Sequence, residues 1–249
     1  KRINLILLSL ILITLFATTV LAETARETRA FWVVRGDNLL SMESIDRMIQ
    51  DHLALNMNAI LVQVNGRAEA YYQSKVTPVV PGVSADFDPL QIIIEKAHAN
   101  GLQVHAWINA YTVGPLGVKL ANPNHVANLH PDWMTVDSTG ISVIDYTASQ
   151  AEADALPALM LEPGLPEVQD FVAAMFLEVV ENYDVDGVHY DYIRYPARVF
   201  GYHPYNLERF EAEYGVNPME IANDANRLME ELGREKYWEL SRDWDQLRR

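Results

Sequence analysis

The chain has 249 residues, of which 49% are hydrophobic, and it contains no cysteine. Disulfides and thiolate metal sites are therefore excluded, and stability must come from a large apolar core. The 34 Asp and Glu residues outnumber the 19 Lys and Arg residues, which gives a formal net charge of −15. That charge argues against nucleic acid and anionic membrane surfaces as partners.

The first residues have the pattern of an export signal. Two basic residues precede an apolar run from residue 3 to residue 20, and Val20-Leu21-Ala22 fits the small-residue rule for signal peptidase. We therefore expect a signal peptide over 1–22 and an exported domain over 23–249, periplasmic or extracellular, with no stable membrane association after cleavage. A membrane anchor is the alternative, because the run nearly reaches the ~20 residues of a spanning helix.

From residue 29 onward, short β-branched or aromatic runs alternate with amphipathic helical stretches, as in consecutive βαβ units. The runs predict four strands, over residues 30–34, 59–65, 103–111 and 185–195. Ser41, Asp88-Pro89 and Pro166-Glu167 mark the starts of the intervening helices. Residues 204–249 are helical in character, with a break at 215–218.

Two connections are unusually long, residues 66–87 and 112–165, and both follow the carboxyl ends of predicted strands, where barrel enzymes build their active sites. A complete eight-fold barrel takes ~250 residues, but only four strands are visible. The pattern predicts an α/β fold of the (β/α)₈ TIM-barrel type, with about four βα units forming an N-terminal half that is truncated at the C-terminus. An open four-stranded α/β sheet is the alternative, although no Gly-rich phosphate loop follows the first strand.

Polar residues recur at every second position of three predicted strands, and alternation sends such residues to one face. The face opposite is apolar and suited to packing under helices. A polar stripe on neighbouring strands is costly to bury unless it lines a wet cavity, which favours a site over a polar core. The stripe consists of Gln63, Asn65, His105, Trp107, Asn109, His189 and Asp191.

Asp191 is the only carboxylate of this stripe and is the first candidate for a catalytic acid, base or nucleophile. Glycoside cleavage needs two carboxyl groups, and Glu69 is the nearest other one at a strand end, with Asp37 as a further candidate. Amides, imidazoles and guanidinium groups can orient a sugar, and aromatic faces suit the apolar side of a pyranose ring. The predicted substrate-binding residues are Asn65, Arg67, His105, Trp107, Asn109, Tyr111, His189, Arg194 and Tyr195.

With those residues in place, the chain resembles the glycosyl-hydrolase-like family ten, formerly catalogued as a domain of unknown function. The likeness covers nearly all of the predicted mature chain and rests on segments 29–33, 63–72, 88–90, 97–109, 130–133, 163–168 and 186–196. It implies a (β/α)₈ glycosidase fold acting on peptidoglycan glycan strands or another polysaccharide. The segment from Asp186 to Asp191 is also faintly similar to the nucleophile strand of α-amylase-type barrels, except that His189 stands in the place of their arginine.

The sequence therefore predicts a glycoside hydrolase that needs no cofactor, with Asp191 acting at the anomeric centre of a polysaccharide. A non-catalytic glycan-binding barrel is the alternative, since the second carboxylate is not evident. A metal-dependent hydrolase is less favoured: His105, His189 and Asp191 share a face, but no His-x-His pair or helical His-Glu-x-x-His accompanies them.

Overall fold

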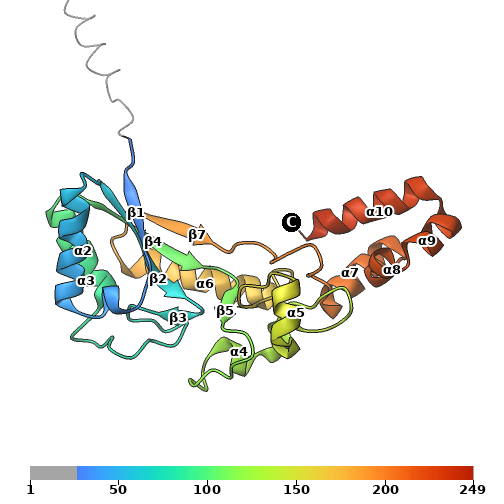
Figure 1. Ribbon diagram of the computed structural model, residues 1–249, viewed down its shortest axis with the longest axis horizontal. Coiled ribbons are helices and arrows are strands. Elements are labelled where there is room, and N and C mark those ends of the chain that lie inside the picture. Colours follow the sequence, from blue (N-terminus) through green and yellow to red (C-terminus); the bar gives the residue numbers. More distant parts are fainter. Residues whose placement is uncertain (1–26, 249) are drawn as a thin grey trace, which may run out of the picture.

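A computed structural model describes residues 27–248 (Figure 1). Its centre is a parallel sheet of four strands, β1 (Ala30–Val33), β2 (Ala59–Gly66), β4 (Gln103–Asn109) and β7 (Gly187–Asp191). Their order in the sheet is their order along the chain, as in a β/α barrel and unlike the reversed order of a doubly wound sheet. The α/β fold of the barrel type, with four βα units, is confirmed.

Helices α2 (Met42–Ala54), α3 (Pro89–Ala99) and α6 (Pro166–Asn182) connect these strands. The predicted starts are confirmed, because the Ser41 side chain accepts a hydrogen bond from the Ser44 amide and Asp88 caps α3 with Pro89 in its first turn. Helices α2 and α3 lie side by side against the sheet (Figure 1). Their apolar residues join alternate strand residues in one core, including Ile45, Ile49, Ile93, Val62, Val104 and Ala106.

The opposite face of the sheet is concave. The indole Nε1 of Trp32 on β1 lies 3.2 Å from Nε2 of His189 on β7, although β2 and β4 separate these two strands. Side chains from the two outer strands can meet in this way only if the sheet curls toward them. The curl is that of a barrel wall, and it faces the polar stripe inward.

The long connections hold short elements of their own. The first contains β3 (Glu69–Ala70), which pairs antiparallel with β2. The second contains a two-stranded sheet of β5 (Thr112–Gly114) and β6 (Leu159–Met160), the helices α4 (Val126–Leu129) and α5 (Ala148–Ala153), and 3₁₀ turns at Pro131–Trp133 and Val143–Asp145. A further 3₁₀ turn, Asp37–Leu39, follows β1.

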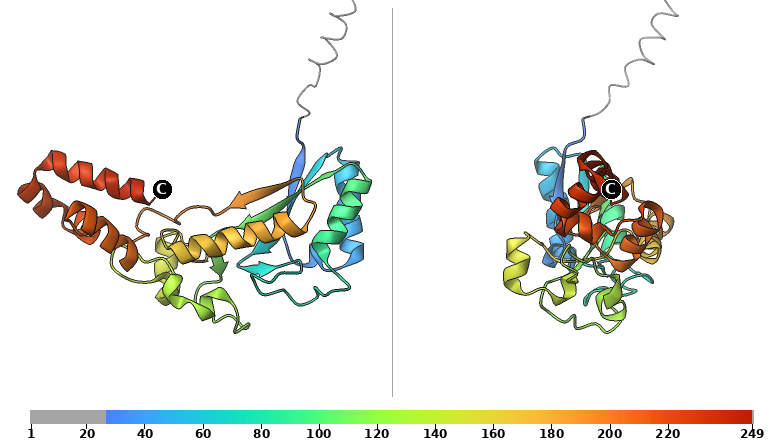
Figure 2. Two further views of the ribbon diagram at one scale, coloured as in Figure 1. Left: turned by 180° about the vertical axis from the view of Figure 1, so that it is seen from behind. Right: turned by 90° about the vertical axis from the view of Figure 1, so that its right-hand side faces the viewer.

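Beyond β7, the chain forms α7 (Pro204–Tyr214), α8 (Pro218–Asn223), α9 (Ala225–Leu232) and α10 (Arg234–Leu247). These helices extend away from the sheet at the end opposite to α2 and α3 (Figure 2). They enclose a second apolar cluster around Phe210, Leu240 and Trp244. The predicted helical character and the break near Gly215 are confirmed.

The predicted signal peptide over 1–22 lies outside the described residues. Among residues 27–248, none of the helices has the length and apolar character needed to cross a membrane.

Candidate active site

A cleft of about 290 Å³ opens at the carboxyl ends of β2, β4 and β7. This is the edge at which barrel enzymes place their catalytic groups. Four of the predicted site residues meet there, namely Arg67, Trp107, Asn109 and Asp191, together with Gln63 of the polar stripe. The full lining is Val34, Arg35, Gln63, Arg67, Trp107, Asn109, Thr112, Pro157, Ala158, Asp191 and Tyr192.

Asp191 is half-buried and both of its carboxylate oxygens accept hydrogen bonds. The indole Nε1 of Trp107 donates to Oδ2 at 2.9 Å, and the Tyr192 backbone N–H donates to Oδ1 at 2.8 Å. Tyr192 has a φ of 50°, a left-handed conformation that costs about 1–3 kcal/mol for a residue other than glycine. The turn ends β7 at Asp191. The Tyr192 amide and the Trp107 indole thus hold the carboxylate from two sides.

A chain of hydrogen bonds that begins at the Arg35 guanidinium continues across the cleft through neutral side chains. Arg35 donates from Nη1 to Gln63 Oε1 at 3.0 Å, and Gln63 Nε2 donates to Asn109 Oδ1 at 3.1 Å. Asn109 Nδ2 in turn donates to Thr112 Oγ1 at 3.0 Å. Gln63 and Asn109 are buried. Because each amide both donates and accepts in this chain, its oxygen and nitrogen can be placed in only one way. This part of the cleft is therefore rigid before any ligand binds.

His189 lies behind Trp107 and is not part of the cleft lining. Its ring meets the Trp107 ring nearly edge-on, with centroids 6.1 Å apart and planes at 81°. Because the Trp32 indole can only donate, Nε2 of His189 is the acceptor and a neutral ring carries its proton on Nδ1. His189 thus packs the indole that holds Asp191.

Arg35 and Arg67 place two positive charges on the lining. Burial, and then the neighbouring Arg67 charge, lower the pKa of Arg35 below its usual value, while Glu69 acts in the opposite direction. Neither guanidinium forms an ion pair with a carboxylate of residues 27–248. Asp191 is the only acidic residue of the lining.

Glu69, the expected partner of Asp191, lies on β3 opposite Gly66. The turn that places it there has two left-handed residues, Arg67 (φ 63°) and Ala68 (φ 53°). Glu69 is half-buried and is not among the residues that line the cleft. The further acidic candidate, Asp37, begins a 3₁₀ turn and is exposed.

Asn65 does not share the face of Gln63, so the parity expectation is wrong at this position. A β-bulge shifts the register between the two residues, and Asn65 pairs with Ile108 rather than with Asn109. Its side chain is fully buried and donates to Thr77 Oγ1 at 2.9 Å. Asn65 therefore ties the long connection after β2 to the sheet and presents no polar group to the cleft.

His105 and Tyr111 also lie outside the cleft lining. His105 pairs with Gly187, at the opposite end of the shared register from Asn109 and Asp191. Tyr111 follows β4 and is half-buried, and burial followed by the charge of Glu162 raises its pKa above 10.0.

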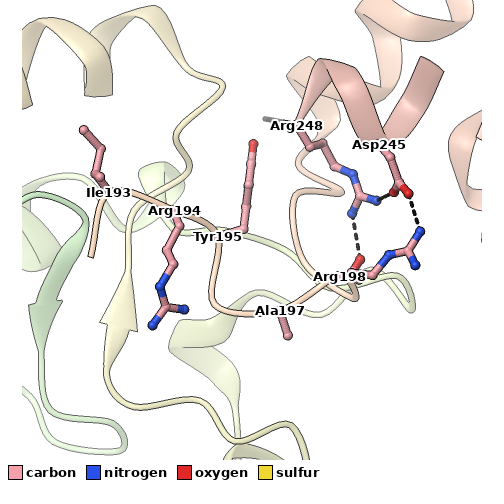
Figure 3. A pocket seen from close by; sticks show the side chains of 7 residues that line it. All are labelled: Ile193, Arg194, Tyr195, Ala197, Arg198, Asp245 and Arg248. Carbon is pink, nitrogen blue, oxygen red and sulfur yellow. Dashed lines mark hydrogen bonds and ion pairs between the residues drawn. The ribbon is translucent and has the colours of Figure 1, made fainter. Parts of the chain in front are cut away.

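Arg194 and Tyr195 line a different pocket of about 460 Å³, between the segment after β7 and α10. The expected fourth strand continues to residue 195, but β7 ends at Asp191 because Tyr192 turns the chain. Arg194 points away from Arg198 and Arg248 in this pocket (Figure 3). Arg248 donates to the carbonyl oxygens of Arg198 at 2.7 Å and of Phe200 at 2.6 Å, and these bonds tie the end of α10 to the segment.

Sequence reasoning missed Glu162, a carboxylate with 0% exposure. Its Oε2 accepts from Thr135 Oγ1 at 2.8 Å, and its Oε1 accepts from Asn206 at 2.9 Å and from the Tyr195 hydroxyl. Burial and then this carboxylate raise the pKa of Tyr195. An acidic residue directly after the apolar run 159–161 is the signal that could have identified it.

Within residues 27–248, no three His, Asp or Glu side chains lie close enough together to hold a metal ion. His105, His189 and Asp191 share a face but do not form such a cluster.

Among solved structures, α-L-fucosidase isoenzyme 2 from Paenibacillus thiaminolyticus is similar in fold. Its TM-score is 0.58 at 20% identity, over 89% of this chain and 30% of that chain.

Two curated proteins are similar to this chain in sequence. Glycosyl hydrolase YngK of Bacillus subtilis (strain 168) is 29% identical over 225 residues, which are 83% of this chain and 40% of that protein. Glycosyl hydrolase DigH of Escherichia coli (strain K12) is 32% identical over 59% of this chain and 33% of that protein. The chain spans less than half the length of either relative. A family model described as Glycosyl hydrolase-like 10 matches residues 27–248, and the chain belongs to this family.

Proposed function

We propose that the protein is a glycoside hydrolase in which Asp191 is a catalytic carboxylate. The observation that carries the proposal is the placement of this carboxylate at the carboxyl end of β7, in the cleft and held by Trp107 and the Tyr192 amide. Membership of the family supports a carbohydrate-related function. The cleft edge is also where barrel glycosidases carry out their chemistry.

In this proposal, Asp191 acts at the anomeric centre, where positive charge develops in the transition state. Two donors keep its oxygens in place, so little reorganisation is needed when that charge appears. Trp107 and Tyr192 offer aromatic surface beside it, and Asn109 offers an amide for sugar hydroxyls. Glu69 is our candidate for the second carboxyl group, two residues from Arg67 in the turn that borders the cleft.

The proposed substrate is a polysaccharide, and peptidoglycan glycan strands are the first to test. Such a substrate agrees with export from the cytoplasm, which we propose from the pattern of residues 1–22. His189, and Arg194 and Tyr195 in the neighbouring pocket, are proposed to contact or orient more distant parts of the glycan.

The test compares Asp191→Asn with the unchanged full-length protein on purified cell-wall glycan strands and on storage polysaccharides. We expect the variant to release no new reducing ends while it still binds the glycan. Asp170→Asn, a change of the same kind on the exposed side of α6, should keep full activity. Undiminished turnover by Asp191→Asn would remove Asp191 from the mechanism.

A glycan-binding protein without hydrolytic activity is the second candidate, because Asp191 is the only carboxylate on the cleft lining among the described residues and hydrolysis ordinarily uses two. Saturable binding by the unchanged protein, with no new reducing ends from any of the polysaccharides, would favour this second function. Loss of activity in both Asp191→Asn and Glu69→Gln would favour the first.

A further inference from the structure

The charges on the cleft lining are unusual for a protein with a net charge of −15. Arg35 and Arg67 face the same small space, and each lacks a carboxylate partner among residues 27–248. Four other arginines also lack one, but all four are exposed to water: Arg194, Arg209, Arg234 and Arg242. Arg35 is therefore the only described arginine that is half-buried without an acidic partner.

The position of Arg35 is built into the fold. Its guanidinium donates to Gln63 Oε1 at 3.0 Å, and its side chain lies against Gly66. A Cβ at Gly66 would come within 2.8 Å of Arg35 Nη1, so the guanidinium occupies space that the missing side chain at position 66 leaves open. The neutral Gln63 amide and the Gly66 backbone hold the Arg35 guanidinium in place, and neither balances its positive charge.

Arg67 is held through its backbone. Its left-handed φ of 63° turns the chain after β2, and the buried His125 contacts the Arg67 carbonyl oxygen through Nε2 at 2.7 Å. The side chain of Arg67 remains exposed while lining the cleft. Arg35 is thus held through its guanidinium and Arg67 through its backbone, and both have guanidinium donors available.

Two neighbouring guanidinium groups repel one another because each carries a positive charge. Glu69 is close enough to offset part of this charge but is not within ion-pair distance. An anionic group on the ligand would relieve the repulsion, and guanidinium groups match carboxylates with paired hydrogen bonds.

We propose that the cleft binds a glycan whose sugar units carry a carboxylate, and that Arg35 and Arg67 bind this carboxylate while Asp191 faces the glycosidic bond. The inference rests on the proposed function for the role of Asp191. The carboxylate can be the C6 carboxylate of a uronic acid or an ether-linked acid on an amino sugar of the cell wall. Both present the same planar anion to the two arginines.

The test measures binding in the full-length Asp191→Asn protein, which separates affinity from turnover. The ligands are polyuronate oligosaccharides and peptide-free cell-wall glycan oligosaccharides, each as prepared and after chemical reduction of the carboxyl groups to alcohols. We expect reduction to weaken binding about 10-fold or more for at least one of the two glycans, and the glycan that shows the effect identifies the source of the carboxylate. Added salt should weaken binding of the acidic form only.

Arg35→Gln and Arg67→Gln should each remove most of this preference, so that the acidic and the reduced forms of the glycan bind with nearly equal affinity. Arg35→Lys, which keeps the charge, should retain part of it. Arg242→Gln, an exposed change on α10, should behave like the parent. Thermal midpoints verify that each variant is folded, and Arg67→Gln tests the proposal even if Arg35→Gln fails to fold.

Equal affinity for the acidic and reduced forms of both glycans would overturn the inference, as would a preference that survives in both glutamine variants. Failure of the proposed function gives a different result. In that case the unchanged protein cleaves nothing, but carboxylate-dependent binding through the two arginines persists. Cleavage of neutral glycans without any preference for a carboxylate would support the proposed hydrolase function and contradict the proposed anion site.

Discussion

The indole N–H of Trp107 lies 2.9 Å from Oδ2 of Asp191, across the pairing of β4 with β7. The register places Trp107 opposite His189 and Asn109 opposite Asp191, so the indole reaches diagonally to the carboxylate. The contacts made by Trp107 and the Tyr192 amide therefore supply the hydrogen bonds that orient this carboxylate.

Replacing Trp107 with phenylalanine should lower kcat/KM about 10- to 100-fold. The change keeps an aromatic ring against His189 but removes a hydrogen bond to a charged group, which is worth about 1.5–3 kcal/mol. Steady-state release of reducing ends in the full-length protein measures this loss.

Trp238→Phe is the matched control, because Trp238 is exposed on α10, and it should leave the kinetics unchanged. A fall confined to kcat, with KM unaltered, would agree with a residue that positions Asp191. Kinetics of Trp107→Phe equal to those of the unchanged protein would show that the indole contact does not serve catalysis.

Gly187→Ala should destabilise the protein by about 1–3 kcal/mol, the range typical of overpacking. A Cβ at this position would come within 2.6 Å of Nδ1 of His105, and neighbouring strands hold both residues in place. Urea denaturation measures the loss. The double variant with His105→Ala should recover part of it, and a double-variant effect equal to the sum of the single effects would show that the two residues do not collide.

Much of the cleft could be predicted from the sequence because strand alternation is a local rule. Gln63, Trp107, Asn109 and Asp191 lie on one face and meet in the cleft, as their spacing predicts. The parallel order of the strands then brings their carboxyl ends to one edge. A pattern with period two and a βαβ sequence were sufficient for this part of the site.

The failures have identifiable causes in the backbone. One extra residue in β2 turns Asn65 to the other face of the sheet. The composition of that strand gives no signal that predicts the bulge. The left-handed Tyr192 ends β7 four residues early and separates Arg194 and Tyr195 from Asp191. Glu162 belongs to a long connection without periodicity, so its role emerges only from tertiary contacts.

Asp137→Asn should reduce stability at neutral pH by about 1–3 kcal/mol, because it removes a buried acceptor of several hydrogen bonds. Burial alone would raise the pKa of Asp137, but the Tyr146 hydroxyl and the amides of Ile141 and Thr139 outweigh it and hold the pKa below 3.8. A lowered pKa in the folded state means that this stability is fully present above pH 3.8 and is lost as the pH falls through the lower, folded-state pKa.

Urea denaturation at pH 7 and at successive points below pH 4 tests this expectation for Asp137. The unchanged protein should lose stability over the acid range, and Asp137→Asn should lose less because its asparagine does not titrate. Asp51→Asn, an exposed change on α2, should follow the unchanged protein. Identical acid profiles for Asp137→Asn and the unchanged protein would contradict the assignment.

Glu162→Gln should impair both stability and activity, although Glu162 is not on the cleft lining. Its Oε1 accepts from the Tyr195 hydroxyl and from Asn206 Nδ2, so it fastens the segment after Asp191 and the first turn of α7 to the connection before α6.

A glutamine has one carbonyl oxygen in place of two carboxylate oxygens, so its N–H₂ group would face either the Asn206 Nδ2 donor or the Thr135 hydroxyl, and at least one bond to the buried carboxylate would be lost. The resulting loss of about 1–3 kcal/mol should appear in urea denaturation. Tyr195→Phe deletes only one donor and should have the smaller effect on stability. If the segment from Tyr192 to Tyr195 helps to hold Asp191, both variants should also lower kcat at temperatures where each remains fully folded. Full activity in a destabilised Glu162→Gln would restrict this network to a role in folding.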